Sequence, residues 1–279
     1  MNMTFDSSFL LSIVTFAYLL AGLAYICLFV FKKDFFGPVG TILTAVTLAL
    51  HTGAIIWRWV ESYRLGIGHA PFSNLYESLI FFAWAIAFLY LIIEWVYKNR
   101  FIGAFVIPLA FLSMAYAGLQ PKEIQPLLPA LKSNWLIAHV VTCFLAYAGF
   151  AVSAGLALML LLARSNMLKG KLTDRLPGEK VLDSLIYQTI AFGFILLTAG
   201  IITGSIWAQQ AWGSYWSWDP KETWSLITWF IYAAVLHARM VRGWAGNRMA
   251  VLSLIGFLSM LFTYMGVNLF LSGLHSYAK

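Results

Sequence analysis

The residues best suited to chemistry are concentrated in one short polar stretch between two long apolar segments. From Trp212 to Trp224 the chain reads W-G-S-Y-W-S-W-D-P-K-E-T-W, which contains four tryptophans and a tyrosine. Trp and Tyr do collect at membrane interfaces, but one or two at each helix end would satisfy that role. The crowding of rings therefore predicts a surface for a flat, poorly soluble aromatic ligand.

Two of the five histidines are expected at the same level as this stretch. His139 lies about one turn into an apolar segment, and His275 closes the last apolar segment. Two imidazoles beside an aromatic surface are the arrangement that gives six-coordinate haem iron. We therefore expect His139 and His275 to ligate a haem iron, with the porphyrin resting on the indoles of Trp212, Trp216, Trp218 and Trp224.

The other histidines are placed differently by depth. His237 follows Lys221 by 16 residues, which is roughly 24 Å along a helix. His51 is expected roughly 18 Å above the opposite surface, so the two differ by roughly 12 Å in a core of ~30 Å. An intramembrane histidine is a functional candidate, and a second iron ligand for His237 would have to come from another chain. We expect His51 to be buried and hydrogen-bonded, and His69 to be a solvated loop residue.

The elements that carry these residues are membrane helices. The 279-residue chain is 61% hydrophobic and only 10% charged, a composition with too little polar surface for a soluble globular protein. Apolar runs of membrane-spanning length predict an all-α polytopic membrane protein, a single domain over residues 1–279, with eight helices at about 8–31, 39–60, 74–97, 101–119, 135–163, 184–207, 221–241 and 250–274.

Charge predicts how these helices are oriented. Alternate loops carry twelve of the 18 Lys and Arg residues, and the other loops with the two termini carry six. Since positive loops stay on the cytoplasmic side, both termini and the tryptophan-rich stretch are expected outside. The net charge of +7 is explained by this asymmetry and does not indicate a nucleic-acid partner.

Several polar residues also have a purely structural explanation. Asp219, Pro220 and Glu222 fit a helix start with an N-cap, a proline in the first turn and a capping box, so Asp219 is both a haem-site candidate and a cap. Asn74 with Glu77 fits a second capping box. Cys27 and Cys143 have no C-x-x-C spacing, which excludes a thiol oxidoreductase and a c-type cytochrome, and both are expected to be small buried residues.

What the helices lack excludes two further classes. No Asp, Glu, Lys or Arg falls in mid-membrane, as a proton-coupled transporter would require. No helix carries two histidines thirteen or fourteen residues apart, the spacing with which b-type cytochromes stack two haems. The pattern favours a protein that handles haem over a pump or an electron carrier.

The stretch W-G-S-Y-W-S-W-D-P-K-E-T-W-S-L resembles the WWD signature of the cytochrome c assembly family. The number of helices, the order of His139, the tryptophans, His237 and His275, and the stretch P-F-S-N-L-Y-E-S-L at 71–79 are most similar to the CcsA (ResC) type. The resemblance covers essentially the whole chain.

The resemblance implies a haem lyase (holocytochrome c synthase) subunit of a bacterial cytoplasmic membrane. Haem b in transit would be held by His139 and His275 outside and by His237 within the membrane, and presented to the C-x-x-C-H motif of an apocytochrome c. It implies as partners a CcsB (ResB)-type membrane protein, which supplies the second transmembrane histidine, apocytochrome c and thiol-reducing proteins. No residue is assigned as a catalytic acid or base.

Three alternatives remain open at this point. A CcmC-like haem chaperone would lack ligation chemistry, and its six expected helices differ from the eight predicted here. A HemX-like membrane protein would regulate haem synthesis. A structural subunit would use the tryptophans only as membrane anchors.

Overall fold

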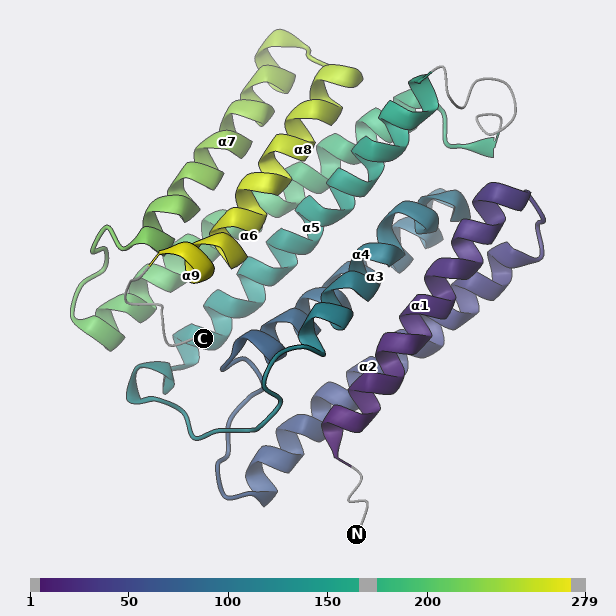
Figure 1. Cartoon of the computed structure of the whole chain (residues 1–279). Helices are drawn as coiled ribbons and strands as arrows, with labels where there is room; N and C mark the ends of the chain where they lie inside the picture. Colours follow the sequence, from purple (N-terminus) through teal and green to yellow (C-terminus); the bar gives the residue numbers. More distant parts are fainter. Residues whose placement is uncertain (1–5, 166–174, 272–279) are drawn as a thin grey trace. The chain divides into compact units, whose positions relative to one another are not determined.

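The computed structural model describes residues 6–165 and 175–271, which fold as two compact helical units divided between Leu128 and Pro129 (Figure 1). The described part contains no β-strand, and it has eight helical segments long and apolar enough to cross a membrane. The prediction of an eight-helix polytopic membrane protein is confirmed. Many large apolar side chains on the outside of the helices are exposed, as expected of surfaces that face lipid.

Unit 1 consists of α1 (Ser7–Phe31), α2 (Phe36–Arg64), α3 (Leu75–Tyr97), the 3₁₀ turn η1 (Arg100–Ile102) and α4 (Gly103–Ala117). In it, α1 packs against α2 and α4, and α3 packs against α4 (Figure 1). Asp6 caps α1 by accepting a bond from the Ser8 backbone N–H, and Asn74 caps α3 through the Glu77 N–H. These side chains satisfy backbone donors that the first turn leaves open.

Unit 2 consists of η2 (Pro129–Leu131), α5 (Asn134–Arg164), α6 (Glu179–Trp212), α7 (Pro220–Arg242), α8 (Asn247–Leu261), the π-helical turn η4 (Phe262–Gly266) and α9 (Val267–Phe270). The mostly buried α5 packs against α6 and α8, and α7 packs against α8 and α6 (Figure 1). At the α5–α6 contact, Gly149 and Gly193 let the backbones approach closely, the usual role of small residues between membrane helices.

Both predicted boundaries of the sixth helix are wrong by five residues. We expected it to begin near residue 184, and it begins at Glu179. We expected the sixth helix to end near residue 207, but α6 continues through Ala208, Gln209, Gln210 and Ala211 to Trp212. These residues favour helix, and α6 stops only where Gly213 adopts the left-handed conformation, with φ of 76°. The connecting loop is therefore limited to residues 213–219, and Trp207 and Trp212 lie on a helix.

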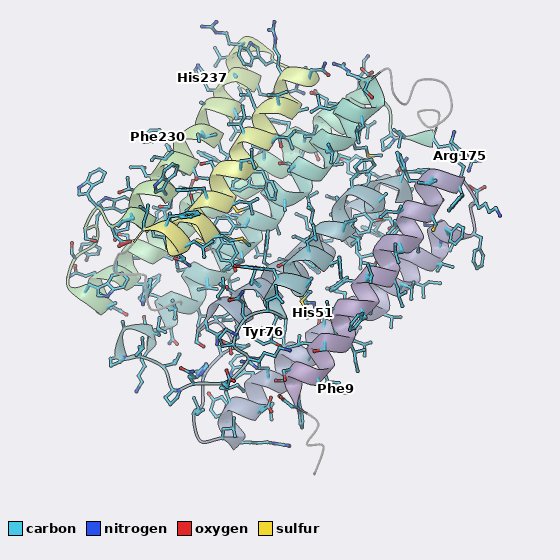
Figure 2. All side chains as sticks on the ribbon, viewed as in Figure 1. Phe9, His51, Tyr76, Arg175, Phe230 and His237 are labelled. Atoms are coloured by element: carbon cyan, nitrogen blue, oxygen red, sulfur yellow. The ribbon has the colours of Figure 1, made fainter. Side chains whose placement is uncertain are left out.

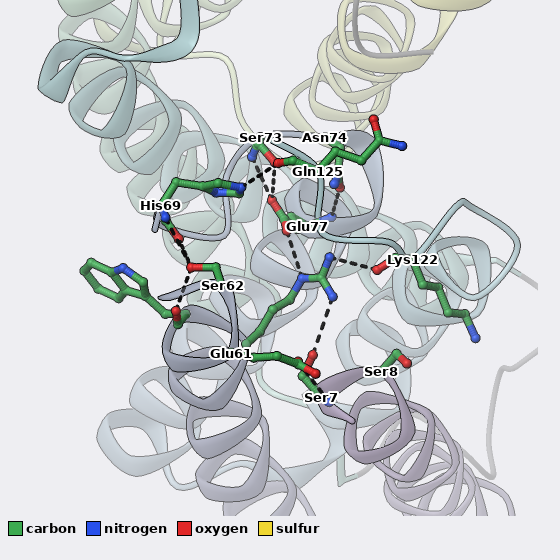
Figure 3. Close-up of polar contacts among 12 residues, drawn as sticks. Ser7, Ser8, Glu61, Ser62, His69, Ser73, Asn74, Glu77, Lys122 and Gln125 are labelled. Atoms are coloured by element: carbon green, nitrogen blue, oxygen red, sulfur yellow. Dashed lines mark hydrogen bonds and ion pairs between the residues drawn. The ribbon is translucent and has the colours of Figure 1, made fainter. Parts of the chain in front are cut away.

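Unit 1 is closed at one end by a buried ion pair, which we call the unit 1 clasp (Figure 3). Arg58 on α2 donates from Nε to Glu77 on α3 at 2.8 Å, and both side chains are almost fully buried. Its Nη2 also donates to the Lys122 carbonyl at 3.0 Å. Glu77 accepts from the Ser73 backbone N–H and hydroxyl, so only the Asn74 half of the predicted capping box is formed.

His69 belongs to the same region and is not solvated, which corrects our expectation. It is only 6% exposed, and its two ring nitrogens lie 2.9 Å from the carbonyl oxygens of Ala70 and Gln125 (Figure 3). The polar backbone of two irregular loops requires partners when it is buried, and the imidazole supplies them. His69 therefore fastens the segment after α4 to the segment after α2.

The prediction for His51 is confirmed, since it is fully buried and its Nδ1 lies 3.2 Å from the Tyr18 hydroxyl. Farther along unit 1, Glu94 accepts bonds from the hydroxyl groups of Tyr25 and Tyr90 at 2.7 and 2.5 Å. Polar side chains in the interior of unit 1 thus pair with one another, as a low-dielectric interior requires, with the exception of His51 Nε2, which has no partner among the described residues.

Candidate functional site

The tryptophan-rich segment joins α6 to α7 in unit 2, and its second half is fixed by a helix cap. Asp219 accepts from the Lys221 backbone N–H at 3.0 Å, and Glu222 accepts from the Asp219 N–H at 3.2 Å. The predicted capping box is therefore present. Glu222 also accepts from the Ser217 N–H at 2.8 Å, so one carboxylate binds the backbone on both sides of Trp218.

The backbone of Trp218 is strained in this arrangement. Its φ is 59°, in the left-handed region that bulky residues rarely adopt, and its side chain is 68% exposed. The ring lies edge-on to Trp216, with centroids 5.8 Å apart. The strained backbone lowers the stability of the chain, and the exposed indole does not offset that cost by packing in the interior. Strain of this kind is typical of ligand-binding sites.

His139 on α5 is oriented by the backbone of α6. Its Nδ1 lies 2.8 Å from the Gly200 carbonyl oxygen, and because a carbonyl only accepts, Nδ1 carries the hydrogen. The ring lone pair is then on Nε2, the arrangement found for histidines that bind metals. His139 thus has the tautomer that the predicted iron ligand requires.

Two glycines of α6 make room for this imidazole. A Cβ added to Gly204 would lie 2.6 Å from His139 Nδ1, and one added to Gly200 would lie 2.5 Å from Cys143 Sγ. Cys143 is buried, as predicted, and its sulfur lies 3.6 Å from His139 Nδ1. The notch at Gly200 and Gly204 therefore fixes both side chains against α6.

Trp207 connects this histidine to the end of α6. Its ring stacks on His139 with centroids 5.8 Å apart and meets Trp212 at 4.9 Å. It is 2% exposed, and its Nε1 donates to the Ala130 carbonyl at 2.8 Å. Trp207 is thus a buried support behind His139, whereas Trp212 stands at the end of the helix.

Trp224 lies one turn into α7 and contacts the C-terminal part of unit 2. Its ring centroid is 4.3 Å from that of Phe262, the first residue of η4. The Thr263 hydroxyl donates to the Trp224 carbonyl at 3.1 Å. The π-helical form of η4 is rare and frequently occurs at functional sites.

These positions define the aromatic junction, by which we mean His139, Trp212, Trp216, Trp218 and Trp224 with the Asp219 cap. It holds three ring groups within unit 2: His139 with Trp207 and Trp212, Trp216 with Trp218, and Trp224 with Phe262. The described residues contain no cluster of three His, Cys, Asp or Glu side chains fit for a bare metal ion. A haem iron needs only one or two imidazoles.

One predicted ligand lies away from the junction, and another lies outside the described residues. His237 is exposed on α7, toward the turn that leads to α8 (Figure 2). It lies 13 residues from Trp224, roughly 20 Å along the helix, so His139 and His237 cannot bind one iron. His275 lies outside the described residues, which end at Leu271.

Sequence reasoning missed the residues that orient the His139 imidazole. Gly200 and Gly204 form a G-x-x-x-G pattern, the known signal for close helix contacts in membranes, and it could have identified the notch. No sequence signal identifies Phe262 or Asn268 as neighbours of α7.

Comparison with known proteins gives a consistent family match. The family described as Cytochrome C assembly protein matches residues 72–275. The cytochrome c biogenesis protein CcsA of Guillardia theta is 40% identical, with 99% of this chain and 98% of that protein covered. The CcsA proteins of Prochlorococcus marinus and Gloeobacter violaceus are 42% and 38% identical, with 85% and 86% of this chain and 83% and 86% of theirs covered.

A solved structure with a similar fold is that of the cytochrome c haem lyase CcmF. The TM-score is 0.69 at 17% identity, with 93% of this chain covered. This chain spans 46% of the length of that protein. At this identity the likeness establishes a shared fold.

Proposed function

Because the chain belongs to the cytochrome c assembly protein family, we propose that the aromatic junction binds haem and presents it for covalent attachment to an apocytochrome c. A role in cytochrome c maturation and haem handling follows from the CcsA relatives. The observation that supports the finer assignment is the bond between His139 Nδ1 and the Gly200 carbonyl, since it selects the tautomer whose lone pair is on Nε2.

The cargo in this proposal is haem b, bound without a covalent link while it is in transit. Nε2 of His139 is one axial ligand, and His275, assigned from the sequence, is the other. The indoles of Trp212, Trp216, Trp218 and Trp224 cover the macrocycle, for which exposed flat rings are suited. The exposure and strain of Trp218 support this role.

The chemistry of attachment needs a positioned haem more than an acid or base. Each cysteine thiol of the C-x-x-C-H motif adds across one haem vinyl group, so that a C–S bond forms and the thiol hydrogen ends on the neighbouring carbon. Electrons balance without an oxidant. Holding the vinyl edge toward the incoming thiols supplies much of the rate, and the junction residues provide that fixed orientation.

His237 fits a separate step within the membrane. It lies on an exposed face of α7 together with Phe230, Met240 and Val241, where a second membrane protein can reach it (Figure 2). We assign this face to a CcsB (ResB)-type partner that contributes the second ligand of a transmembrane haem, with thiol-reducing proteins keeping the client cysteines reduced.

The chain is a multi-pass membrane protein. On the charge asymmetry of its loops, we assign it to a bacterial cytoplasmic membrane with both termini and the aromatic junction on the outer side. That orientation places the haem where apocytochrome c is found in such systems.

Coexpression tests the proposal. The full chain is produced with a CcsB-type partner and an apocytochrome c reporter, and covalent haem in the reporter is measured by haem staining after denaturing electrophoresis. We expect His139→Ala to abolish staining and added imidazole to restore part of it, because imidazole fills an empty axial position. Normal staining with the variant would remove His139 as ligand.

The indoles are tested separately in the same system. Trp216→Ala with Trp218→Ala should lower the haem content of the purified chain while its amount in the membrane stays constant. An unchanged haem content would instead favour tryptophans that only anchor the chain at the interface.

A further inference from the structure

Lys221 is directed across unit 2 by a single polar contact. It lies in the first turn of α7, and its Nζ donates to Asn268 Oδ1 on α9 at 3.1 Å. The ammonium group only donates, so the amide oxygen must face it. The amide nitrogen of Asn268 is bonded to the same carbon as that oxygen, so its N–H groups lie beside the ammonium without bonding to it.

The pair has more donors than acceptors. Within residues 6–165 and 175–271, no carboxylate lies within ion-pair distance of the Lys221 ammonium, and no acceptor is within hydrogen-bonding distance of the Asn268 amide nitrogen. The Asp219 carboxylate accepts from the Lys221 backbone N–H as the helix cap. Side by side, an ammonium and an amide N–H₂ match the two oxygens of a carboxylate.

The surroundings connect this pair with the aromatic junction. Lys221 and Trp224 are three residues apart on α7 and therefore share one helix face, and Trp224 contacts Phe262 in the turn that leads to Asn268. An ammonium and a flat indole thus lie on one face of α7, and both contact the segment from η4 to α9.

We infer that Lys221 and Asn268 form the receptor for a carboxylate group of the tetrapyrrole cargo, an inference that rests on the proposed function. Haem is a flat macrocycle with two propionate carboxylates on one edge. Its ring meets the indoles while a propionate takes the open donors of the pair. This contact sets which edge faces the junction and so turns the opposite, vinyl-bearing edge outward.

The test compares haem with its dimethyl ester, in which both propionates are neutral. Purified full chain in detergent is titrated with each compound, and dissociation constants are obtained from tryptophan quenching and absorbance. The wild-type chain should bind haem about tenfold more tightly than the ester, the effect of about one charge-assisted hydrogen bond. Lys221→Gln should reduce this ratio to about one.

Two further variants sharpen the result. Asn268→Asp is nearly isosteric, but its carboxylate pairs with Lys221 and repels a propionate, so it should weaken haem binding and leave ester binding unchanged. Lys132→Gln is the matched control, because Lys132 is an exposed lysine of the same unit, and it should keep the tenfold ratio. Melting temperatures identify any variant that fails to fold, and if Lys221→Gln does so, Asn268→Asp decides.

The outcomes separate this inference from the proposed function. A tenfold ratio that persists in folded Lys221→Gln or Asn268→Asp would overturn the receptor, as would equal wild-type binding of haem and ester. In both cases haem binding that depends on His139 would still support the proposed function. If the wild-type chain binds neither compound, the proposed function fails first and the receptor fails with it.

Discussion

The unit 1 clasp and the aromatic junction both concentrate polar and aromatic side chains at a helix connection, but they treat them in opposite ways. In the clasp, Arg58, Glu77 and His69 are buried, and each is bonded to groups within unit 1. At the junction, Trp218 is exposed and strained, and Lys221 faces a neutral amide.

This difference distinguishes a region that stabilises the fold from a region suited to bind a ligand. Complete pairing in a low-dielectric interior stabilises the fold and leaves no donor or ring for a ligand. Exposed rings and surplus donors, held in place by caps and backbone contacts, contribute little to stability but are prepared for a ligand. Mutations in the clasp should therefore change the free energy of unfolding, and mutations at the junction should mainly change the affinity for haem.

The largest effect is expected from breaking the clasp. Arg58→Met leaves the buried Glu77 carboxylate without its partner, which should lower the free energy of unfolding by about 3 kcal/mol or more. Unfolding of the purified chain by sodium dodecyl sulfate in mixed micelles measures it. The double variant with Glu77→Leu should recover part of the loss, because no lone charge remains.

Arg64→Met is the control, since Arg64 is exposed above the Trp57 ring and should cost less than about 1 kcal/mol. Haem affinity of the folded Arg58 variant should stay at the wild-type value. A variant of normal stability with weakened haem binding would place the clasp among the binding residues and contradict the comparison.

An intermediate effect is expected at the notch behind His139. Gly204→Ala places a methyl group where His139 Nδ1 now lies, 2.6 Å from the new Cβ, so the ring must turn and lose the Gly200 carbonyl. Haem affinity should fall about tenfold, as when a ligand loses its orienting partner. Gly178→Ala meets nothing within 4 Å and should change nothing, and equal affinities for the two variants would show that His139 needs no orientation.

The smallest effect is expected at Trp218, whose backbone conformation is strained. Trp218→Gly and Trp218→Ala remove the same indole, so both should weaken haem binding equally. Glycine adopts a φ of 59° without cost, so the glycine variant should be the more stable by about 1 kcal/mol. Thermal unfolding of the two variants measures this, and a less stable glycine variant would show that the strain is absent.

The fold could be predicted from the sequence because apolar length and turn residues act locally. Eight hydrophobic runs form eight membrane-length helices in the described residues, and the Asp219 cap lies where the local signals indicated. The end of α6 was missed because the apolar run ends near residue 207, whereas helix-favouring residues continue α6 to Trp212.

The candidate site was predictable only in part. Tryptophan crowding and helix depth indicated His139 and the loop rings as candidates, since both signals are properties of the sequence itself. The Gly200 carbonyl, the burial of His69 and the Asn268 contact depend on which helix packs against which, and no local pattern encodes that. The sequence therefore indicates which side chain is a candidate ligand, whereas the packing of the helices determines how that side chain is oriented.

The central claim is that His139 holds a haem iron at the aromatic junction. It is tested most directly by the reduced absorption spectrum of the purified wild-type and His139→Ala chains, each with and without a CcsB-type partner, followed by acid extraction of the pigment. Extractable b-type haem in the wild-type chain that falls in the variant and returns in part with imidazole is the predicted result. Wild-type preparations without haem, or a variant with the same haem content and spectrum, would contradict the claim.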